Sequence, residues 1–330
     1  MRACNWYRFL VLCMLAAALL GVLNLYFGQP PPEPCGCDCT QALARQRAEL
    51  KVFYEHEIET KEKKIKQLAE SASALRDSMK TAEVEIVEEG TGRHRLAVLV
   101  PFRNRHEELQ EFVPHIHRFL SRQSVLHDIW IINQADSYRF NRASLLNAGF
   151  LMSRDRCDYI VMHDVDLLPD NDQLQYSYPS SGPYHISSPS LHPLYHYKTF
   201  VGGVLSLTRG QFEQVNGMSN LFWGWGREDD EFYQRMKEAG MTIQYPTGIT
   251  TGYNTFRHNH DKKKRPRDQE SYYSKQIKSV MKDRSSGLSS LQYTLVSHVN
   301  MTINNAPFHF VSIELHCDPD VTPACVSKQR

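Results

Sequence analysis

Short apolar runs alternate with amphipathic segments through the last two-thirds of the chain. The residues at 96–100, 129–132 and 159–162 are apolar, as in buried strands. The segments after the first two runs, to about Ser121 and Met152, have the character of helices. This alternation predicts an α/β domain with a mainly parallel sheet. Further strands are expected at 185–188, 201–208, 241–245, 291–296 and 308–315.

A helix with an acidic first turn is predicted near residue 230. Phe232, Met236 and Ala239 recur at helical spacing, and Gly240 stands where a helix C-cap glycine belongs. The four consecutive acids at 228–231 therefore occupy the first turn of this helix. A helix dipole favours such carboxylates by about 0.3–1 kcal/mol, which accounts for one or two acids but not for four.

Two tryptophans, Trp223 and Trp225, alternate with glycines directly before this helix. An indole ring can stack on the C–H bonds of a sugar, while carboxylates accept hydrogen bonds from its hydroxyl groups. Glycine lets the backbone move or approach a ligand closely. One carboxylate can also take a proton from a hydroxyl group that becomes a nucleophile. This segment therefore predicts a sugar-binding site.

The N-terminus has the pattern of a membrane anchor followed by a stem. Residues 9–27 are almost wholly apolar, close to the roughly 20 residues that span a bilayer. Arg2 and Arg8 precede this segment, and no Lys or Arg follows it until Arg45, so the positive-inside rule places residues 1–8 in the cytoplasm. A cleaved signal peptide is the alternative. Residues 28–92 are interpreted as a stem, and residues 93–330 as the catalytic domain.

The stem combines a Pro-rich segment with a polar, glycine-free helix or short coiled coil at about 41–79. Cys35, Cys37 and Cys39 are too closely spaced for a common zinc site. They allow interchain disulfides and thus a dimer through the stem, although free or lipidated thiols are the alternative.

The overall charge argues against nucleic acid as a partner, because the formal net charge of the 330 residues is only +1.

Near the C-terminus, Cys317 and Cys325 bracket a short segment and could close a disulfide loop. Asn300-Met301-Thr302 is an acceptor sequence for N-glycosylation. Both features are consistent with a secretory compartment.

Charged side chains follow the predicted strands, where ligands bind in parallel sheets. Asp164 and Asp166 follow the strand at 159–162, and His258 and His260 share the same two-residue spacing. Asp166 with the two histidines suits a divalent ion such as Mn²⁺, with positions left for phosphate oxygens. A strand-to-loop turn and ordinary loop histidines are the alternatives. Three arginines near strand ends could match phosphate: Arg103, Arg105 and Arg142.

Four motifs, in this order, resemble the β-1,4-galactosyltransferase family over about residues 93–267. They are Pro101-Phe102-Arg103-Asn104-Arg105, Phe140-Asn141-Arg142-Ala143, the Asp164 and Asp166 pair, and Trp223-Gly224-Trp225-Gly226-Arg227-Glu228-Asp229-Asp230. His258-Asn259-His260, together with Arg227 in place of a glycine, resembles the branch that builds the proteoglycan linkage region.

The resemblance implies an A-type glycosyltransferase fold, a Rossmann-like mixed sheet flanked by helices, in a single-pass type II Golgi membrane protein with a lumenal catalytic domain. It implies UDP-galactose as donor, Mn²⁺ as cofactor and xylose on proteoglycan core proteins as acceptor. Alternatives are transfer to GlcNAc, a non-catalytic sugar-binding module, a membrane-tethered scaffold, and a metal-dependent phosphodiesterase.

The resemblance also implies roles for individual residues. Asp229 is expected to be the catalytic base, and the metal ligands are expected to be Asp166, His258 and His260. Acceptor contacts are implied for Arg227, Glu228, Asp229 and Asp230. Donor contacts are implied for Pro101, Phe102, Arg103, Asn104, Arg105, Phe140, Asn141, Arg142, Asp164, Val165, Tyr195, Trp225 and Arg267.

Overall fold

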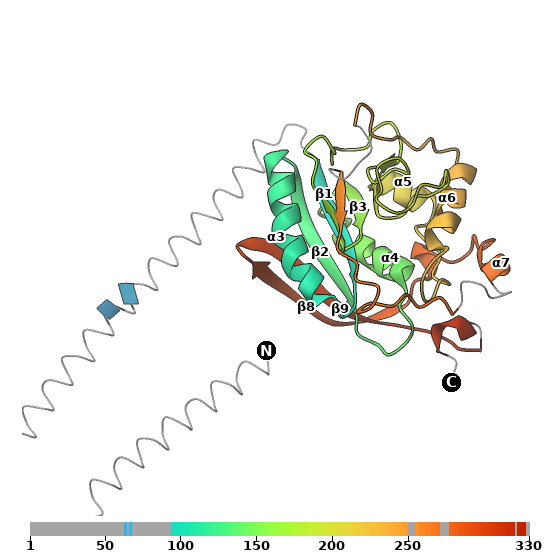
Figure 1. Ribbon diagram of the computed structural model, residues 1–330. Coiled ribbons are helices and arrows are strands. Elements are labelled where there is room, and N and C mark those ends of the chain that lie inside the picture. Colours follow the sequence, from blue (N-terminus) through green and yellow to red (C-terminus); the bar gives the residue numbers. More distant parts are fainter. Residues whose placement is uncertain are drawn as a thin grey trace, which may run out of the picture. The chain divides into compact units, whose positions relative to one another are not determined.

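The computed structural model describes residues 63–64, 66–67, 94–249, 255–270, 277–320 and 322–327 (Figure 1). The chain divides into two compact units, Met1–Glu89 and Gly90–Arg330, and the description below concerns the second. The predicted anchor at 9–27 and most of the predicted stem lie outside the described residues. Among the residues that are described, no helix has both the length and the apolar character needed to cross a membrane.

A seven-stranded mixed sheet forms the centre of the domain, in the order β5-β6-β3-β1-β2-β9-β8. The central strand β1 runs parallel to β2 and β3, and β9 runs parallel to β2, whereas β5, β6 and β8 pair antiparallel with their neighbours. The strands are β1 (Arg95–Phe102), β2 (Leu126–Gln134), β3 (Tyr159–His163), β5 (Tyr184–His185), β6 (Val204–Thr208), β8 (Tyr293–Ile303) and β9 (Ala306–Leu315).

Helices cover both faces of this sheet, as predicted for a mixed α/β fold (Figure 1). The helix α3 (His106–Arg122) packs its apolar side on one face, in a core with alternate residues of β1 such as Val98 and Val100. The helices α4 (Arg142–Ser153), α5 (Arg209–Gln214) and α6 (Glu228–Glu238) contribute to the core on the other face, with Ala97 and Leu99. The helix α7 (Ile277–Val280) is a single turn.

Most predicted strands are present, but their bounds differ and one prediction was wrong. The segment 241–245 is not a strand, because only Gln244 makes an isolated bridge, to Tyr184. The predicted strand at 185–188 is reduced to the two residues of β5. The predicted strand at 201–208 begins only at Val204, after Gly203 adopts a φ of +76°.

Two three-residue strands, β4 (Leu167–Pro169) and β7 (Phe256–His258), form a separate antiparallel ribbon that the sequence did not predict. The ribbon brings the segment after β3 beside a segment that lies about ninety residues later in the chain. This pairing, rather than the main sheet, sets the positions of Asp166 and His258. The predicted disulfide between Cys317 and Cys325 is present.

Candidate active site

A cavity of about 840 Å³ opens beyond the carboxyl ends of β1 and β3, where the sheet was expected to bind its ligand. Most of the predicted site residues line it. They are Pro101, Arg103, Arg105, Phe140, Arg142, Asp164, Val165, Asp166, Tyr195, Trp225, Arg227, Glu228, Asp229, Asp230, His258, His260 and Arg267.

The first turn of α6 brings the predicted acids into this cavity. Gly224, Gly226 and Arg227 all have positive φ values, 86°, 97° and 78°, and turn the chain sharply into the helix. Two of these positions are glycines, which tolerate that conformation without the steric cost that other residues incur. The turn leaves Asp229 half-buried, with its Oδ1 accepting a hydrogen bond from the backbone N–H of Asp230 at 3.0 Å.

The pKa of Asp229 is well above the ordinary value of an aspartate. Burial raises its pKa first, the neighbouring carboxylates of Glu228 and Asp230 raise it further, and Arg142 acts in the opposite direction, with a resulting value of about 8. A base is most effective when its pKa lies near the working pH, because it is then both available and able to hold a proton. The acidic turn is therefore suited to deprotonating a hydroxyl group.

Gly202 makes room for the Asp229 carboxylate. A Cβ atom at this position would lie 2.7 Å from Asp229 Oδ2 and 2.7 Å from Phe200 Cε2. Gly202 precedes β6, far from α6 in the sequence, and it also lines the cavity. A glycine is therefore required here for space, and the chain gives no local signal of that requirement.

Arg142 connects the two acidic groups of the site. It lies at the start of α4, and its Nε and Nη2 atoms are 2.9 Å and 2.8 Å from Asp164 Oδ1. The charges of Asp164, Glu228 and Asp229 raise the pKa of Arg142 despite the opposing effect of its burial. Burial raises the pKa of Glu228 although Arg142 opposes the change, and its Oε2 atom is buried without a hydrogen-bond partner. This Oε2 atom therefore lacks a partner in a residue that lines the cavity.

Trp225 and Tyr195 hold Arg267 between their rings. The guanidinium carbon lies 4.6 Å from the Trp225 ring centre and 5.5 Å from that of Tyr195. Such contacts contribute about 0.5–2 kcal/mol and fix the orientation of both rings. Two aromatic faces and one cation thus lie together beside the acidic turn, as a sugar attached to a phosphate would require.

A buried arginine, Arg139, anchors the tryptophan segment. Its Nε and Nη2 atoms are each 2.7 Å from an Asp268 carboxylate oxygen. The backbone carbonyl of Asp268 accepts a hydrogen bond from the Trp225 N–H at 2.7 Å, while Gly224 N–H donates to Phe140 O. Arg139 also donates to Ala324 O in the disulfide loop. Arg139 could not be predicted from the sequence, because nothing near it in the chain indicates these partners.

Asp166, His258 and His260 meet on one wall of the cavity. His260 Nδ1 lies 3.2 Å from Asp166 Oδ2, and His258 Nε2 lies 3.9 Å from Asp166 Oδ1. The β4–β7 ribbon sets this geometry, because Leu167 pairs with His258 across it. The three residues that the spacing and the family resemblance indicated are therefore neighbours in space.

These residues fit a divalent metal ion in their chemistry. One carboxylate and two imidazoles are suitable donors for Mn²⁺, and His260 Nε2 is buried without a hydrogen-bond partner. Within the described part of the chain, however, no three His, Cys, Asp or Glu side chains are already spaced to hold a metal. Asp166 instead hydrogen bonds to His260 and lies 3.7 Å from Arg105. Metal binding would require these side chains to turn toward a common point.

His192 is a second residue of the site that was not predicted from the sequence. Its buried ring lines the cavity, and its Nδ1 accepts hydrogen bonds from the N–H groups of Leu194 and Tyr195 at 3.0 and 3.1 Å. Burial, followed by neighbouring histidines, lowers the pKa of His192 to about 3, so the ring is neutral. His192 thereby holds the turn that carries Tyr195.

Three predicted donor residues do not line the cavity. Phe102 is buried in the core beneath α3, and Asn104 forms the turn after β1, with a φ of 54°. Asn141 caps α4, because its side chain accepts a hydrogen bond from Ser144 N–H at 2.9 Å and donates to Asn220 O. These three residues shape the backbone of the site, and their predicted direct contact with a donor stays a prediction.

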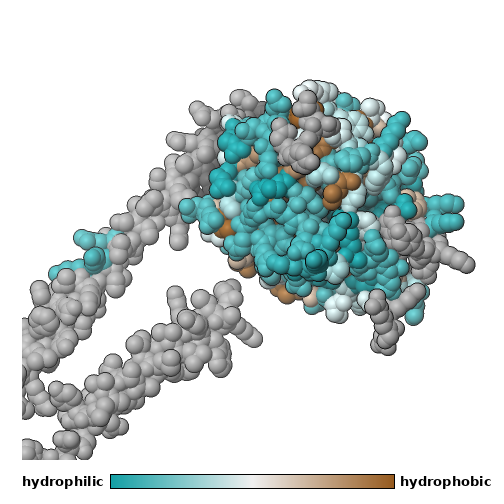
Figure 2. Space-filling model, in the orientation of Figure 1, coloured by the Kyte–Doolittle hydropathy of each residue, from teal (hydrophilic) through white to brown (hydrophobic). Residues whose placement is uncertain are grey.

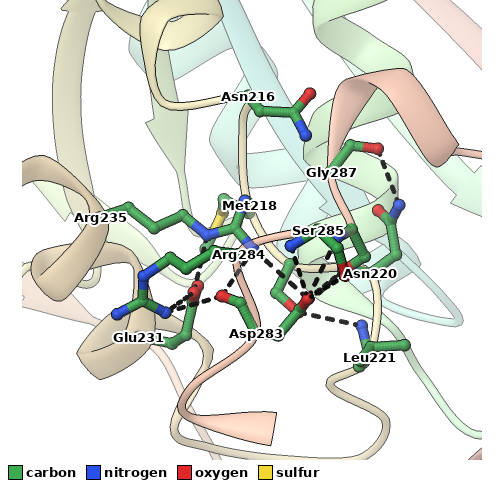
Figure 3. Close-up of polar contacts among 12 residues, drawn as sticks. Asn216, Met218, Asn220, Leu221, Glu231, Arg235, Asp283, Arg284, Ser285 and Gly287 are labelled. Atoms are coloured by element: carbon green, nitrogen blue, oxygen red, sulfur yellow. Dashed lines mark hydrogen bonds and ion pairs between the residues drawn. The ribbon is translucent and has the colours of Figure 1, made fainter. Parts of the chain in front are cut away.

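A buried network of hydrogen bonds and ion pairs holds α6 in place (Figure 3). Arg235 Nε lies 2.7 Å from Glu231 Oε1, and Arg284 Nη1 lies 2.9 Å from the same oxygen. Asp283 receives hydrogen bonds from Ser219, from the backbone N–H and hydroxyl groups of Ser285 and Ser286, and from Arg235 Nη2 at 3.4 Å. The network joins the helix that carries Asp229 to the segment after α7.

Two family comparisons match the chain. Residues 39–179 match the family described as the N-terminal region of glycosyl transferase group 7, and residues 182–259 match the N-terminal domain of galactosyltransferase. The two matches together span the cavity-lining segments from Pro101 to His258.

Named relatives and solved structures agree with these matches. β-1,4-Galactosyltransferase 7 of Mus musculus is 54% identical over 72% of this chain and 73% of its own length. The xylosylprotein 4-β-galactosyltransferase of Caenorhabditis elegans is 45% identical over 72% of this chain and 84% of its own length. The structure of a mutant Drosophila β-1,4-galactosyltransferase 7, in complex with manganese, UDP-Gal and xylobiose, is 49% identical with a TM-score of 0.69, and the match covers 71% of this chain and 100% of that one. The chain belongs to the β-1,4-galactosyltransferase family.

Proposed function

We propose that this protein transfers galactose from UDP-galactose to the 4-hydroxyl group of xylose on proteoglycan core proteins, with inversion at the galactose C1 atom. The observation that carries the proposal is the arrangement of one cavity. It holds a carboxylate with a raised pKa, Asp229, beside the ring of Trp225, and it also holds the Asp166, His258 and His260 group. The related Drosophila enzyme, solved with UDP-Gal and xylobiose, supports this choice of donor and acceptor.

Asp229 is the proposed base. Its carboxylate takes the proton of the xylose hydroxyl group as that oxygen attacks C1 of galactose, and the bond from C1 to the UDP oxygen breaks on the opposite side. A single displacement of this kind inverts the sugar carbon. Trp225 provides the surface on which the sugars lie, and Glu228, Asp230 and Arg227 are the proposed acceptor contacts.

The part of the cavity that contains three arginines is the proposed donor site. Arg105, Arg142 and Arg267 bring positive charge to it, where the diphosphate of UDP carries negative charge. Asp166, His258 and His260 are the proposed ligands of Mn²⁺, which when bound offsets the charge on the departing diphosphate. The protein residues orient the donor, and closing of the tryptophan segment over it excludes water.

The proposed location is the Golgi membrane, with residues 1–8 in the cytoplasm, 9–27 as a signal anchor, 28–92 as a stem and 93–330 in the lumen. The apolar run at 9–27 and the arginines before it support this topology. The disulfide between Cys317 and Cys325 agrees with an oxidising compartment. Dimerisation is also proposed, through the cysteines or the predicted helix of the stem.

The substitution Asp229→Asn tests the assignment of the base. The variant should bind UDP-galactose with unchanged affinity, measured by calorimetry, and should lose about 10²–10⁴-fold in turnover, the usual contribution of a general base. Glu213→Gln is the control, because Glu213 is an exposed acid of α5 that does not line the cavity. Normal turnover by the Asp229 variant would exclude it as the base.

A further inference from the structure

The strand β8 forms an exposed edge of the main sheet. It is last in the strand order and pairs only with β9 within the described sheet. β8 is eleven residues long, Tyr293–Ile303, and it contains no proline and no Asp, Glu, Lys or Arg. Long uncharged edge strands present unpaired backbone groups to other chains, and proteins usually protect them with charges, prolines, bulges or a covering segment.

Apolar side chains are concentrated on this edge. Leu295, Val296, Val299 and Met301 are 53%, 54%, 50% and 45% exposed, and they are four of the eight large apolar side chains that are exposed among the described residues. Figure 2 shows a few separate apolar spots on the mainly hydrophilic side of the domain where Figure 1 places the β8–β9 hairpin. One irregularity lies between Leu295 and Ser297, so the stretch from Ser297 to Ile303 is regular and open to pairing.

The N-glycosylation acceptor sequence lies in the middle of that regular stretch. Asn300-Met301-Thr302 is the only Asn-X-Ser/Thr sequence, with X other than proline, in the 330 residues. Asn300 and Thr302 are both exposed, and Asn300 lies opposite His309 of β9. Strand geometry directs the side chain of Asn300 to the face opposite those of Val299 and Met301.

We propose that Asn300 carries an N-glycan, and that this glycan protects the apolar edge of β8 from pairing with another chain. The proposal rests on the lumenal placement proposed above. In the transfer, the Asn300 side-chain nitrogen forms a bond to the first sugar carbon of a lipid-diphosphate-linked oligosaccharide. The bond from that carbon to the diphosphate breaks, the diphosphate leaves with the electron pair, and a base of the oligosaccharyltransferase takes the amide proton.

A glycan at Asn300 provides the protection against pairing that β8 itself lacks. It is large and hydrated, and it projects from the centre of the segment that an incoming strand would have to contact. The charges and prolines that usually protect an edge are absent from β8 itself. The glycan therefore has the protective role that a charged residue has on other edge strands. A lysine on β8 should restore this protection when the glycan is absent.

The test uses the full chain expressed in a eukaryotic secretory cell. The wild type and Thr302→Ser, which keeps the acceptor sequence, should lose the mass of one N-glycan on treatment with an N-glycosidase. Asn300→Gln should show no mass shift and should form several-fold more high-mass species by size-exclusion chromatography with light scattering. Val299→Lys, added to Asn300→Gln, should return that fraction to the wild-type level.

One further variant distinguishes two reasons why Asn300 could lack a glycan. Either the acceptor sequence at Asn300 is not used, or the domain does not enter the lumen. Pro307→Thr, in the Asn300→Gln background, creates an acceptor sequence at the exposed hairpin residue Asn305. A glycan on that variant but not on the wild type would overturn the proposal at Asn300. If neither the wild type nor this variant carries a glycan, the lumenal placement is contradicted, and so is the proposal that depends on it. Equal association of the wild type and Asn300→Gln would exclude a protective role. Galactose transfer, assayed on the same preparations, reports the proposed activity independently.

Discussion

At the scale of single residues, the pKa of Asp229 predicts the pH dependence of activity. The base must be ionised to act, so kcat/KM for the acceptor should rise with pH and level off above about 8. Glu228→Gln removes a negative charge that raises this pKa, so the inflection should move to lower pH. Glu213→Gln, in the exposed part of α5, should leave the inflection in place. A profile that does not move in the Glu228 variant would show that the carboxylates are not coupled as described.

Gly202 gives a second prediction at this scale. The methyl group of Gly202→Ala would lie within 2.7 Å of Asp229 Oδ2 and of Phe200, so it should displace the carboxylate and reduce kcat by at least about tenfold. Gly210→Ala is the matched control, because a Cβ atom there meets no atom within 4 Å and Gly210 lies in the helix α5. The control should keep full activity and a similar Tm. Equal kcat in both variants would contradict the role of Gly202.

The residues that could be predicted from the sequence were those grouped in local motifs. Asp229 and Trp225 stand in one short segment. Asp166 was indicated by a two-residue spacing after a predicted strand, and His258 by the same spacing to His260. His192, Gly202 and Arg139 could not be found in this way. Each acts through partners that only the folded chain brings near, such as Asp268 for Arg139 and the Tyr195 backbone for His192.

At the scale of elements, the network around Asp283 should hold α6 in place. Asp283→Asn removes an acceptor from buried hydroxyl, N–H and guanidinium groups, and should lower the free energy of unfolding by about 1–3 kcal/mol. Hydrogen bonds from Ser219 and Ser286 outweigh burial and lower the pKa of Asp283 from 3.8 to about 2. The ionised group therefore stabilises the fold above pH 3.8, and this contribution is lost as the pH falls toward 2.

Thermal unfolding as a function of pH checks this prediction. The difference in stability between the wild type and Asp283→Asn should be largest near neutral pH and should shrink as the pH falls from 3.8 toward 2. Asp172→Asn is the control, because Asp172 makes an exposed ion pair with Arg122, and its removal should change stability by less than about 0.5 kcal/mol. A difference that stays constant with pH would assign the effect to packing instead.

Elements with strong periodicity were predicted, and those held by a distant partner were not. The parallel core of β1, β2 and β3, and the helix α6 with Gly240 after it, followed from local patterns. The β4–β7 ribbon escaped prediction because three residues carry no periodicity and each strand depends on the other. The segment 241–245 has apolar residues but only one bridge to a neighbouring strand, so it does not form a strand.

At the scale of the whole molecule, the C-terminal disulfide should stabilise the donor side of the cavity. Arg139 N–H donates to Cys325 O, and its guanidinium group donates to Ala324 O while pairing with Asp268. Replacing Cys317 and Cys325 by serine should lower the free energy of unfolding by about 2–3 kcal/mol for so short a loop. UDP-galactose should also bind more weakly to this variant. A reductant should lower the Tm of the wild type and leave that of the variant unchanged, whereas an equal loss in both would exclude the disulfide as the cause.

A single assay can test the transfer of galactose to xylose. UDP release from UDP-galactose by the purified protein is measured with Mn²⁺, with a β-xyloside or with GlcNAc as acceptor. We expect the xyloside to stimulate release and GlcNAc to have no effect. Stimulation by GlcNAc alone would assign the protein to a different acceptor. If UDP is released with neither the xyloside nor GlcNAc, the proposed activity is contradicted and a sugar-binding module is favoured.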